Sequence, residues 1–185
     1  LPSVMHFARV AAAVLLTVAA SSAGAADVGI TKSHGIAIHG GPGYPAEPAE
    51  LAKYLTQWYL TPPGEVWIGR GIVSPHIDYH RGGLTYARLW NRAAPSIMAA
   101  DLVLIFGTDH NGSPGSITLT PKPYATPFGV LPTDEALIEQ LAKAIGPEAA
   151  YAEELNHRNE HSVELSAVWL HHIFNQNGKA PCPMI

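Results

Sequence analysis

Three short polar segments carry the residue types that bind metal ions or move protons. The first runs from Ser74 to Gly83, where His76, Asp78 and His80 stand two positions apart. Histidine is the commonest metal ligand and exchanges protons near neutral pH. Asp78 could orient such a ligand, and the two glycines of the segment would let a ligand approach the backbone closely. The same residues would also suit a polar surface loop.

The second and third segments repeat this chemistry further along the chain. His110 stands in Gly107 to Gly112, directly after an apolar run. Glu160, His161 and Glu164 stand together in the third segment. A histidine with carboxylates could bind a metal or transfer protons. Equally, the glutamates could cap a helix, because acidic side chains interact favourably with a helix N-terminus.

Composition narrows the classes of function. The chain has 185 residues, about one domain, and it is 47% hydrophobic, which is enough to build a core. A net charge of -4 without a basic patch argues against a nucleic-acid partner. Cys182 is the only cysteine, which rules out an internal disulfide or a multi-cysteine zinc site, and we expect it in the core. His171 and His172 are interpreted as a cationic or solvent-facing pair near a helix end.

The elements that must position these residues follow from hydrophobic periodicity. Helices are predicted at Pro48–Tyr59, Leu84–Ala94, Thr133–Ile145 and Glu160–Phe174. Strands are predicted at Gly69–Ser74, Asp101–Phe106, Ser116–Thr120 and Pro181–Ile185, and Pro121–Leu131 contains several turn formers. The apolar run Asp101–Phe106 is typical of a strand buried on both faces in a parallel sheet. This alternation predicts an α/β fold, a layered sheet with flanking helices.

The predicted sheet brings two of the polar segments together. Ligands bind at the carboxyl ends of strands in α/β sheets. His76 follows one predicted strand and His110 follows another. We therefore expect both histidines at one edge of the sheet.

The first residues have a different character. Val10 to Ala20 is an uncharged apolar run followed by small residues, which is the layout of a secretory signal peptide and is short for a membrane span. Residues 1–26 are interpreted as a candidate signal peptide or an extraneous extension, and residues 27–185 as the α/β domain. No other segment is apolar enough to span a membrane.

Five motifs in order resemble the Memo family, also labelled AmmeMemoRadiSam system protein B. They span the chain from about residue 42 to its end. The matching stretches are Tyr44–Leu51 (Tyr-Pro-Ala-Asp-Pro-x-x-Leu in the family), Ser74–Gly83 (Pro-His-x-x-Tyr/His-x-x-Gly), Gly107–His110 (Gly-x-x-His), Thr126–Gly129 with Asp134 (Thr-Pro-Leu-Gly…Asp) and Glu160–Glu164 (Glu-His-Ser-Ile-Glu).

The resemblance implies a fold like that of class III extradiol dioxygenase catalytic subunits, which use non-haem iron. By motif match, His76 and His110 are the expected metal ligands, for iron or copper. Glu160 and His161 are expected at the pocket, and His161 or His80 could act as the acid/base. Family members usually continue beyond this point and carry a late cysteine ligand there, which Cys182 does not match. The third ligand is therefore expected in a missing C-terminal part.

Three functions remain open from the sequence. The first is a Memo-like metal-binding, redox-active protein. The second is a non-haem iron dioxygenase that cleaves a catecholic ring, and the third is a non-catalytic peptide-binding module on the same fold. The resemblance also implies radical-SAM and AMMECR-like partner proteins. It favours the cytoplasm, whereas a functional signal peptide would mean export.

Overall fold

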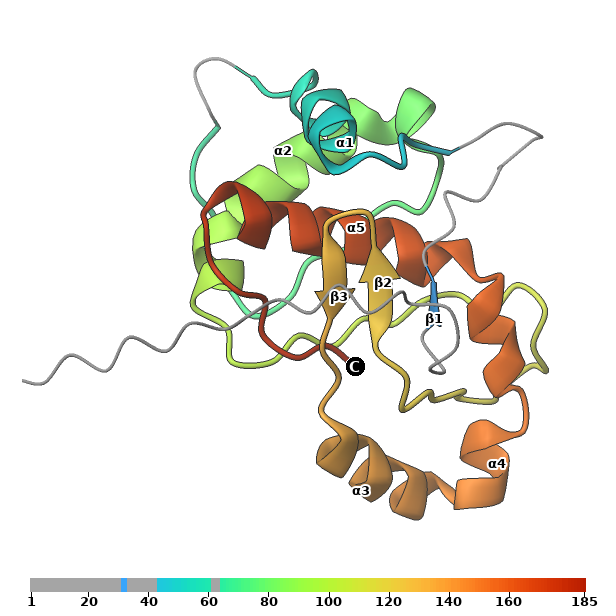
Figure 1. Cartoon of the computed structure of the whole chain (residues 1–185). Coiled ribbons are helices and arrows are strands. Elements are labelled where there is room, and N and C mark those ends of the chain that lie inside the picture. The colour runs from blue at the N-terminus through green and yellow to red at the C-terminus, as the bar shows by residue number, and fades with distance from the viewer. Residues whose placement is uncertain (1–30, 33–42, 61–63) are drawn as a thin grey trace, which may run out of the picture.

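The computed structural model describes residues 31–32, 43–60 and 64–185, and it shows a mixed α/β fold, as predicted (Figure 1). The candidate signal peptide lies outside the described residues. The elements are β1 (Thr31–Lys32), α1 (Pro48–Thr56), α2 (Tyr79–Met98), β2 (Tyr124–Thr126), β3 (Gly129–Leu131), α3 (Glu135–Ile145), α4 (Pro147–Tyr151), the 3-10 helix η1 (Glu154–Arg158) and α5 (His161–Gln176). Among the described residues, no helix has the length and apolar character to cross a membrane.

The sheet is small and mixed, in the order β1-β2-β3. β2 and β3 form an antiparallel hairpin in which Tyr124 pairs with Leu131, and β1 pairs with β2 in parallel. Gly129 closes the hairpin at φ 128°, a conformation that favours glycine. The hairpin lies alongside α5 (Figure 1). Of the turn formers expected in Pro121–Leu131, Pro127 lies in the hairpin turn and Gly129 directly follows it, while the two short strands on either side were not predicted.

The segments predicted to be parallel strands do not form strands of the sheet. Gly69–Ser74 and Ser116–Thr120 form no strand, and Asp101–Phe106 makes only one isolated parallel bridge, from Val103 to Met184. Pro181–Ile185 likewise contributes only bridging residues. The run at 101–106 is not buried on both faces, since Leu104 and Phe106 are exposed. The described part of the chain supplies nothing that covers them.

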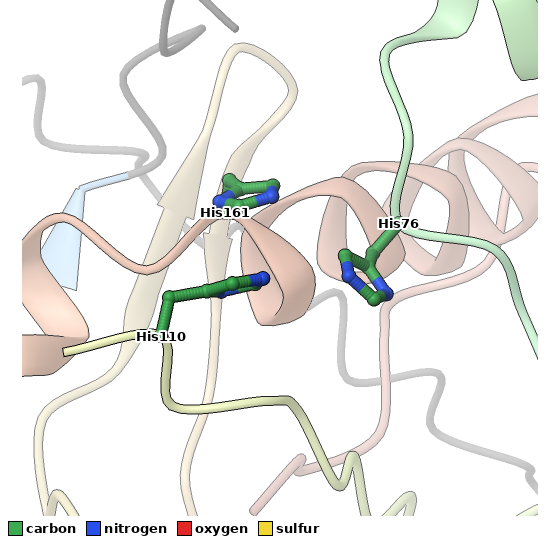
Figure 2. Close-up of side chains that lie close together, drawn as sticks. All are labelled: His76, His110 and His161. Atoms are coloured by element: carbon green, nitrogen blue, oxygen red, sulfur yellow. The ribbon is translucent and has the colours of Figure 1, made fainter. Parts of the chain in front are cut away.

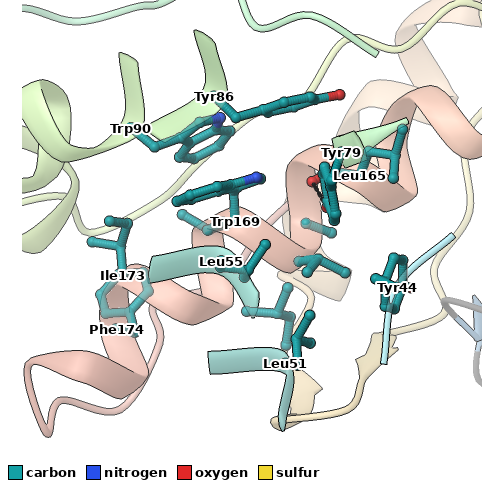
Figure 3. Packing of buried hydrophobic residues seen from close by; sticks show 14 of the residues in the cluster. Tyr44, Leu51, Leu55, Tyr79, Tyr86, Trp90, Leu165, Trp169, Ile173 and Phe174 are labelled. Atoms are coloured by element: carbon teal, nitrogen blue, oxygen red, sulfur yellow. Dashed lines mark hydrogen bonds between the residues drawn. The ribbon is translucent and has the colours of Figure 1, made fainter. Parts of the chain in front are cut away.

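Helix α5 is the centre of the fold. Every residue from Ser162 to Phe174 is buried, so the helix is enclosed on all sides rather than amphipathic. The Trp169 ring lies parallel to Tyr86, with ring centroids 6.1 Å apart, and edge-on to Tyr79 at 6.3 Å (Figure 3). The Tyr79 hydroxyl donates to the Leu165 carbonyl at 2.6 Å. This aromatic packing fixes α2 against α5.

Side-chain caps set where the helices begin. The Asp78 carboxylate accepts the Arg81 backbone N–H at 3.0 Å, so α2 begins at Tyr79, five residues earlier than predicted. The Asp134 carboxylate accepts the Leu137 N–H in the same way at the start of α3. Glu160 caps α5. The four helices predicted from periodicity are confirmed, with shifted ends.

The interpretation of His171 and His172 as cationic or solvent-facing is wrong. Only 6% and 1% of their surfaces are exposed. His171 Nδ1 lies 2.7 Å from Thr126 Oγ1, and His172 Nε2 lies 2.8 Å from the Tyr59 hydroxyl. Burial lowers the pKa of each histidine to about 4. Both rings are therefore neutral parts of the core.

This burial predicts acid sensitivity. Above about pH 6.5 both rings are neutral in the folded and unfolded chains, and stability is at its full value. Between pH 6.5 and 4 the unfolded chain takes up protons that the folded chain excludes, so the free energy of unfolding should fall. Urea unfolding at pH 7 and pH 4.5 measures this difference. It should shrink in His171→Asn and in His172→Gln but not in the exposed control His80→Asn. An equal pH dependence in all four proteins would contradict the assignment.

Candidate metal centre

His76, His110 and His161 meet at one point although they lie far apart in the sequence (Figure 2). One ring nitrogen of each lies within 4.8 Å of the other two. Ring centroids are 5.3 Å apart for His76 and His110, 5.6 Å for His76 and His161, and 4.5 Å for His110 and His161. The expectation that His76 and His110 lie close together is thus met, and His161 joins them. They do not lie at an edge of the sheet, because the predicted strands 69–74 and 101–106 are not part of it.

The His76 segment is fixed by α2. Trp90 Nε1 on α2 donates to Ser74 Oγ at 3.1 Å, and the Tyr86 hydroxyl donates to the Ile77 carbonyl at 3.0 Å. These two bonds lie on either side of His76. The chain before α2 is therefore held in place on both sides of His76, and the His76 ring itself is exposed.

Two expectations about this segment are corrected. Asp78 does not orient a histidine: its carboxylate caps α2 and pairs with Arg81 Nε at 2.5 Å. The two glycines belong to α2 and approach protein rather than a ligand. A Cβ on Gly82 would lie 2.6 Å from the Ile77 side chain, and one on Gly83 would lie 2.3 Å from the Trp58 ring.

The carboxylate that orients a histidine is Glu160. It accepts the His110 backbone N–H at 3.0 Å, and both its oxygens lie 3.0 Å from His110 Nδ1. It also accepts the Ser162 N–H at 2.7 Å as the cap of α5. Burial acts to raise the pKa of Glu160, yet the hydrogen bonds from His110 and Ser162 outweigh it and lower the pKa to about 2. Glu160 is therefore an anion at neutral pH.

This ionisation sets the tautomer of His110. An ionised carboxylate only accepts hydrogen bonds, so Nδ1 of His110 carries the proton that it donates. Nε2 of a neutral ring then carries the free lone pair. A histidine that donates its other ring N–H to a carboxylate is the usual arrangement of a metal ligand.

The loop that carries His110 is docked on the start of α5. The Thr108 N–H donates to Ser162 Oγ at 2.8 Å, and Ser162 Oγ in turn donates to the Thr108 carbonyl at 3.2 Å. Gly107 permits this approach, since a Cβ there would lie 2.4 Å from Val163 Cγ2 and 2.6 Å from Ser162 Oγ. Sequence reasoning assigned no role to Gly107 or Ser162, although both stand inside the motifs.

The same loop is also bound to η1 and to Glu153, the residue before η1. Asn156 Nδ2 donates to Asp109 Oδ2 at 3.1 Å. The Glu153 carboxylate accepts the backbone N–H of Ser113 at 3.0 Å and its hydroxyl at 2.7 Å. Both ends of the loop are thus anchored around His110.

His161 is the first residue of α5, and its ring stacks on His110 at an interplanar angle of 23°. Burial and the neighbouring His110 and His76 lower its pKa, against the opposing influence of Glu160. The ring therefore favours the neutral form that a metal requires. His80 does not join the group: it lies exposed on the first turn of α2.

The donor set fits a transition-metal ion. Ring nitrogens bind at about 2.0–2.1 Å, which places two ligands of one ion about 3.0–3.4 Å apart. The ring nitrogens lie within 4.8 Å of one another, so a movement of the exposed His76 ring toward the other two would be needed to reach these separations. The Glu160 carboxylate supplies the hydrogen-bond partner that orients a ligand. No second metal-ligating group of three appears in the part of the chain that is described.

Comparisons with known proteins agree with the motifs. A sequence model of the family described as Memo-like protein matches residues 36–183. A MEMO1 family protein of Methanococcus maripaludis is 30% identical over 143 residues, which cover 72% of this chain and 50% of the relative. Relatives in Pyrococcus furiosus (30% over 147 residues) and Aquifex aeolicus (26% over 136 residues) cover 77% and 74% of this chain. The chain spans 49% and 35% of those two proteins, so it spans half or less of the relatives it matches.

Because the loop that carries His110 packs against α5 at Gly107, a larger side chain at this position should lower the stability of the fold. Gly107→Ala should destabilise the fold by about 1–3 kcal/mol, because the methyl group overlaps Val163 and Ser162. Gly71→Ala is the matched control, since a Cβ at Gly71 would meet nothing within 4 Å. Urea unfolding measures both. Equal stability of the two variants would show that the loop is not held against α5.

Proposed function

The chain belongs to the Memo family, and on that premise we propose that His76, His110 and His161 together bind one transition-metal ion. The observation that carries this proposal is the convergence of three ring nitrogens from three separate segments. The hydrogen-bonded pair of Glu160 and His110 supports it, because such a carboxylate orients a metal-ligating imidazole.

Imidazole ligands suit iron and copper, the metals implied by the family resemblance, and they also suit zinc and nickel. Iron or copper would supply one-electron redox chemistry at this site. The protein contributes the geometry around it. Glu160 holds His110 by its Nδ1 proton, and α5 presents His161 from its first turn. His76 and His110 are exposed, which leaves room for water or a substrate beside the three rings.

A dioxygenase remains a second candidate because the exposed face of the centre could admit oxygen and a substrate. That reaction needs an acid/base residue beside the ion. His161 would have to serve, since His80 lies outside the cluster. In this case only His76 and His110 of the three would be ligands. Oxygen uptake by the Fe(II)-loaded chain with catechol would support this candidate, and no uptake would count against it.

The other expectations from the sequence stay predictions. They are the radical-SAM and AMMECR-like partners, the cytoplasmic location and the use of the fold as a peptide-binding module. Because the relatives are at least twice as long as the stretch they share with this chain, the activity of the whole protein is also a proposal.

The three-ligand site predicts the metal content of substituted proteins. After loading with Cu(II) or anaerobic Fe(II) and desalting, the wild-type chain should retain about one ion, measured by inductively coupled plasma mass spectrometry. Alanine at His76, His110 or His161 should each lower retention strongly, because two imidazoles bind far more weakly than three. His80→Ala is the control and should retain the ion.

Retention of a full ion by His161→Ala, with loss in the other two variants, would restrict the site to two ligands. Equal retention by all four substituted proteins would contradict the site altogether. Circular dichroism would confirm that each variant is folded.

Substitution of Glu160 should weaken metal binding less than loss of a ligand does, because Glu160 acts through His110. Glu160→Gln should lower metal affinity about 10- to 100-fold, the usual cost of losing the carboxylate that orients a ligand. Competition with a chelator of known affinity measures the change. Glu153→Gln is the control, because Glu153 binds the same loop through Ser113 without contacting His110. Equal affinities for the two variants would show that the carboxylate does not act through His110.

A further inference from the structure

Asn111 lies between His110 and Gly112, where the chain bends and forms neither helix nor strand. The residue is exposed, and its side-chain amide makes no hydrogen bond to a described residue. Asparagine is among the thermolabile residues of proteins, because its side-chain amide can be lost. A following glycine favours this loss, since it has no Cβ to hinder the approach of its backbone nitrogen to the asparagine side chain.

The reaction closes a ring between the two residues and then opens it. The Gly112 backbone nitrogen attacks Asn111 Cγ, so a new N–C bond forms while the bond from Cγ to the amide nitrogen breaks. That nitrogen leaves as ammonia and takes the Gly112 amide proton with it. Water then opens the cyclic imide at one of its two carbonyls. Opening at Cγ gives aspartate, whereas opening at the main-chain carbonyl gives isoaspartate, whose backbone is longer by one CH₂ group.

The sequence contains a second Asn-Gly pair, Asn177 and Gly178, which the structure holds differently. Asn177 is the C-cap of α5, and its Nδ2 donates to the Ile173 carbonyl at 2.7 Å. The Gly178 N–H, whose nitrogen would attack, donates to the Asn175 carbonyl at 3.1 Å. Both reacting groups are thus bound by the end of the helix, and that end must open before they can react. The structure therefore favours the reaction at Asn111 over the same reaction at Asn177.

The surroundings of Asn111 determine what a longer backbone would do. The loop is anchored at Thr108, before this point, and at Ser113, after it. An added CH₂ group between two anchored points must displace the residues that lie between them, and these include His110. The hydrogen bond from the His110 N–H to Glu160, 3.0 Å long, lies directly beside the lengthened backbone.

We propose that Asn111–Gly112 is a site of spontaneous deamidation, and that its isoaspartate product weakens the hydrogen bonds between His110 and Glu160. The modification is irreversible without a repair enzyme, so the fraction of altered chains would grow with the age of the protein. Neither the deamidation nor the displacement of His110 requires a bound ion. Weaker metal binding by the modified chain is a further consequence, and it rests on the proposed function.

The test is incubation of the purified chain, without added metal, in mildly alkaline buffer, followed by peptide mass spectrometry. The mass gain that replaces an amide –NH₂ by –OH should appear at residue 111 at least tenfold faster than at residue 177. Electron-transfer fragmentation should identify isoaspartate among the products. Asn111→Gln should abolish the gain at residue 111, and the matched control Asn177→Gln should leave it unchanged. No gain at residue 111, or equal rates at the two Asn-Gly pairs, would overturn the inference.

The effect on His110 is measured by hydrogen–deuterium exchange on the deamidated fraction, which anion-exchange chromatography separates by its added negative charge. The His110 amide should exchange at least tenfold faster in this fraction than in Asn111→Asp, which has the same charge without the longer backbone. Equal exchange in the two would overturn the displacement of His110. Copper retention by the same fractions then tests the consequence for metal binding. If the unmodified chain retains no copper, the proposed function fails, whereas mass spectrometry and exchange still decide this inference.

Discussion

The Glu160 carboxylate is the interaction on which the site depends. It caps α5 through the Ser162 N–H and holds the His110 backbone and ring, so one anion joins the start of the buried helix to the loop of a second segment. The same contact places the ring proton of His110 on Nδ1. His161 directly follows Glu160, so it stands beside this contact. Glu160 thus combines the two readings that its sequence context left open, a helix cap and a functional carboxylate.

The rigidity of this arrangement comes from α5. The helix is enclosed on all sides, and the packing of Trp169 against Tyr86 and Tyr79 holds its middle. Its first turn is tied to the His110 loop through Ser162 and Thr108. The same enclosure keeps His171 and His172 neutral. Beside the site the packing is looser, since Val73, Leu104 and Phe106 are exposed there. The structure therefore joins a well-packed support for the histidines to a cavity of about 890 Å³ lined by His76 and apolar side chains.

The sequence predicted the histidines better than the elements that hold them. His76 and His110 were expected together, and the helices followed from apolar spacing. The predicted strands at 69–74 and 101–106 are not formed, because β-rich or apolar composition favours a strand while only partners outside the segment decide whether pairing occurs. Asp78 was chosen to orient a histidine because it is a neighbour in sequence, yet its short side chain bonds its own helix. The partner of His110 lies 50 residues away, a pairing that one sequence does not reveal.

The most direct measurement of the central claim is X-ray absorption spectroscopy on the copper- or iron-loaded chain. Three histidine ligands predict a shell of nitrogen scatterers at about 2.0–2.1 Å with outer-ring scattering from three imidazoles. Scattering should fall to two imidazoles in His161→Ala. A spectrum without imidazole scattering, or one unchanged by that substitution, would contradict the account.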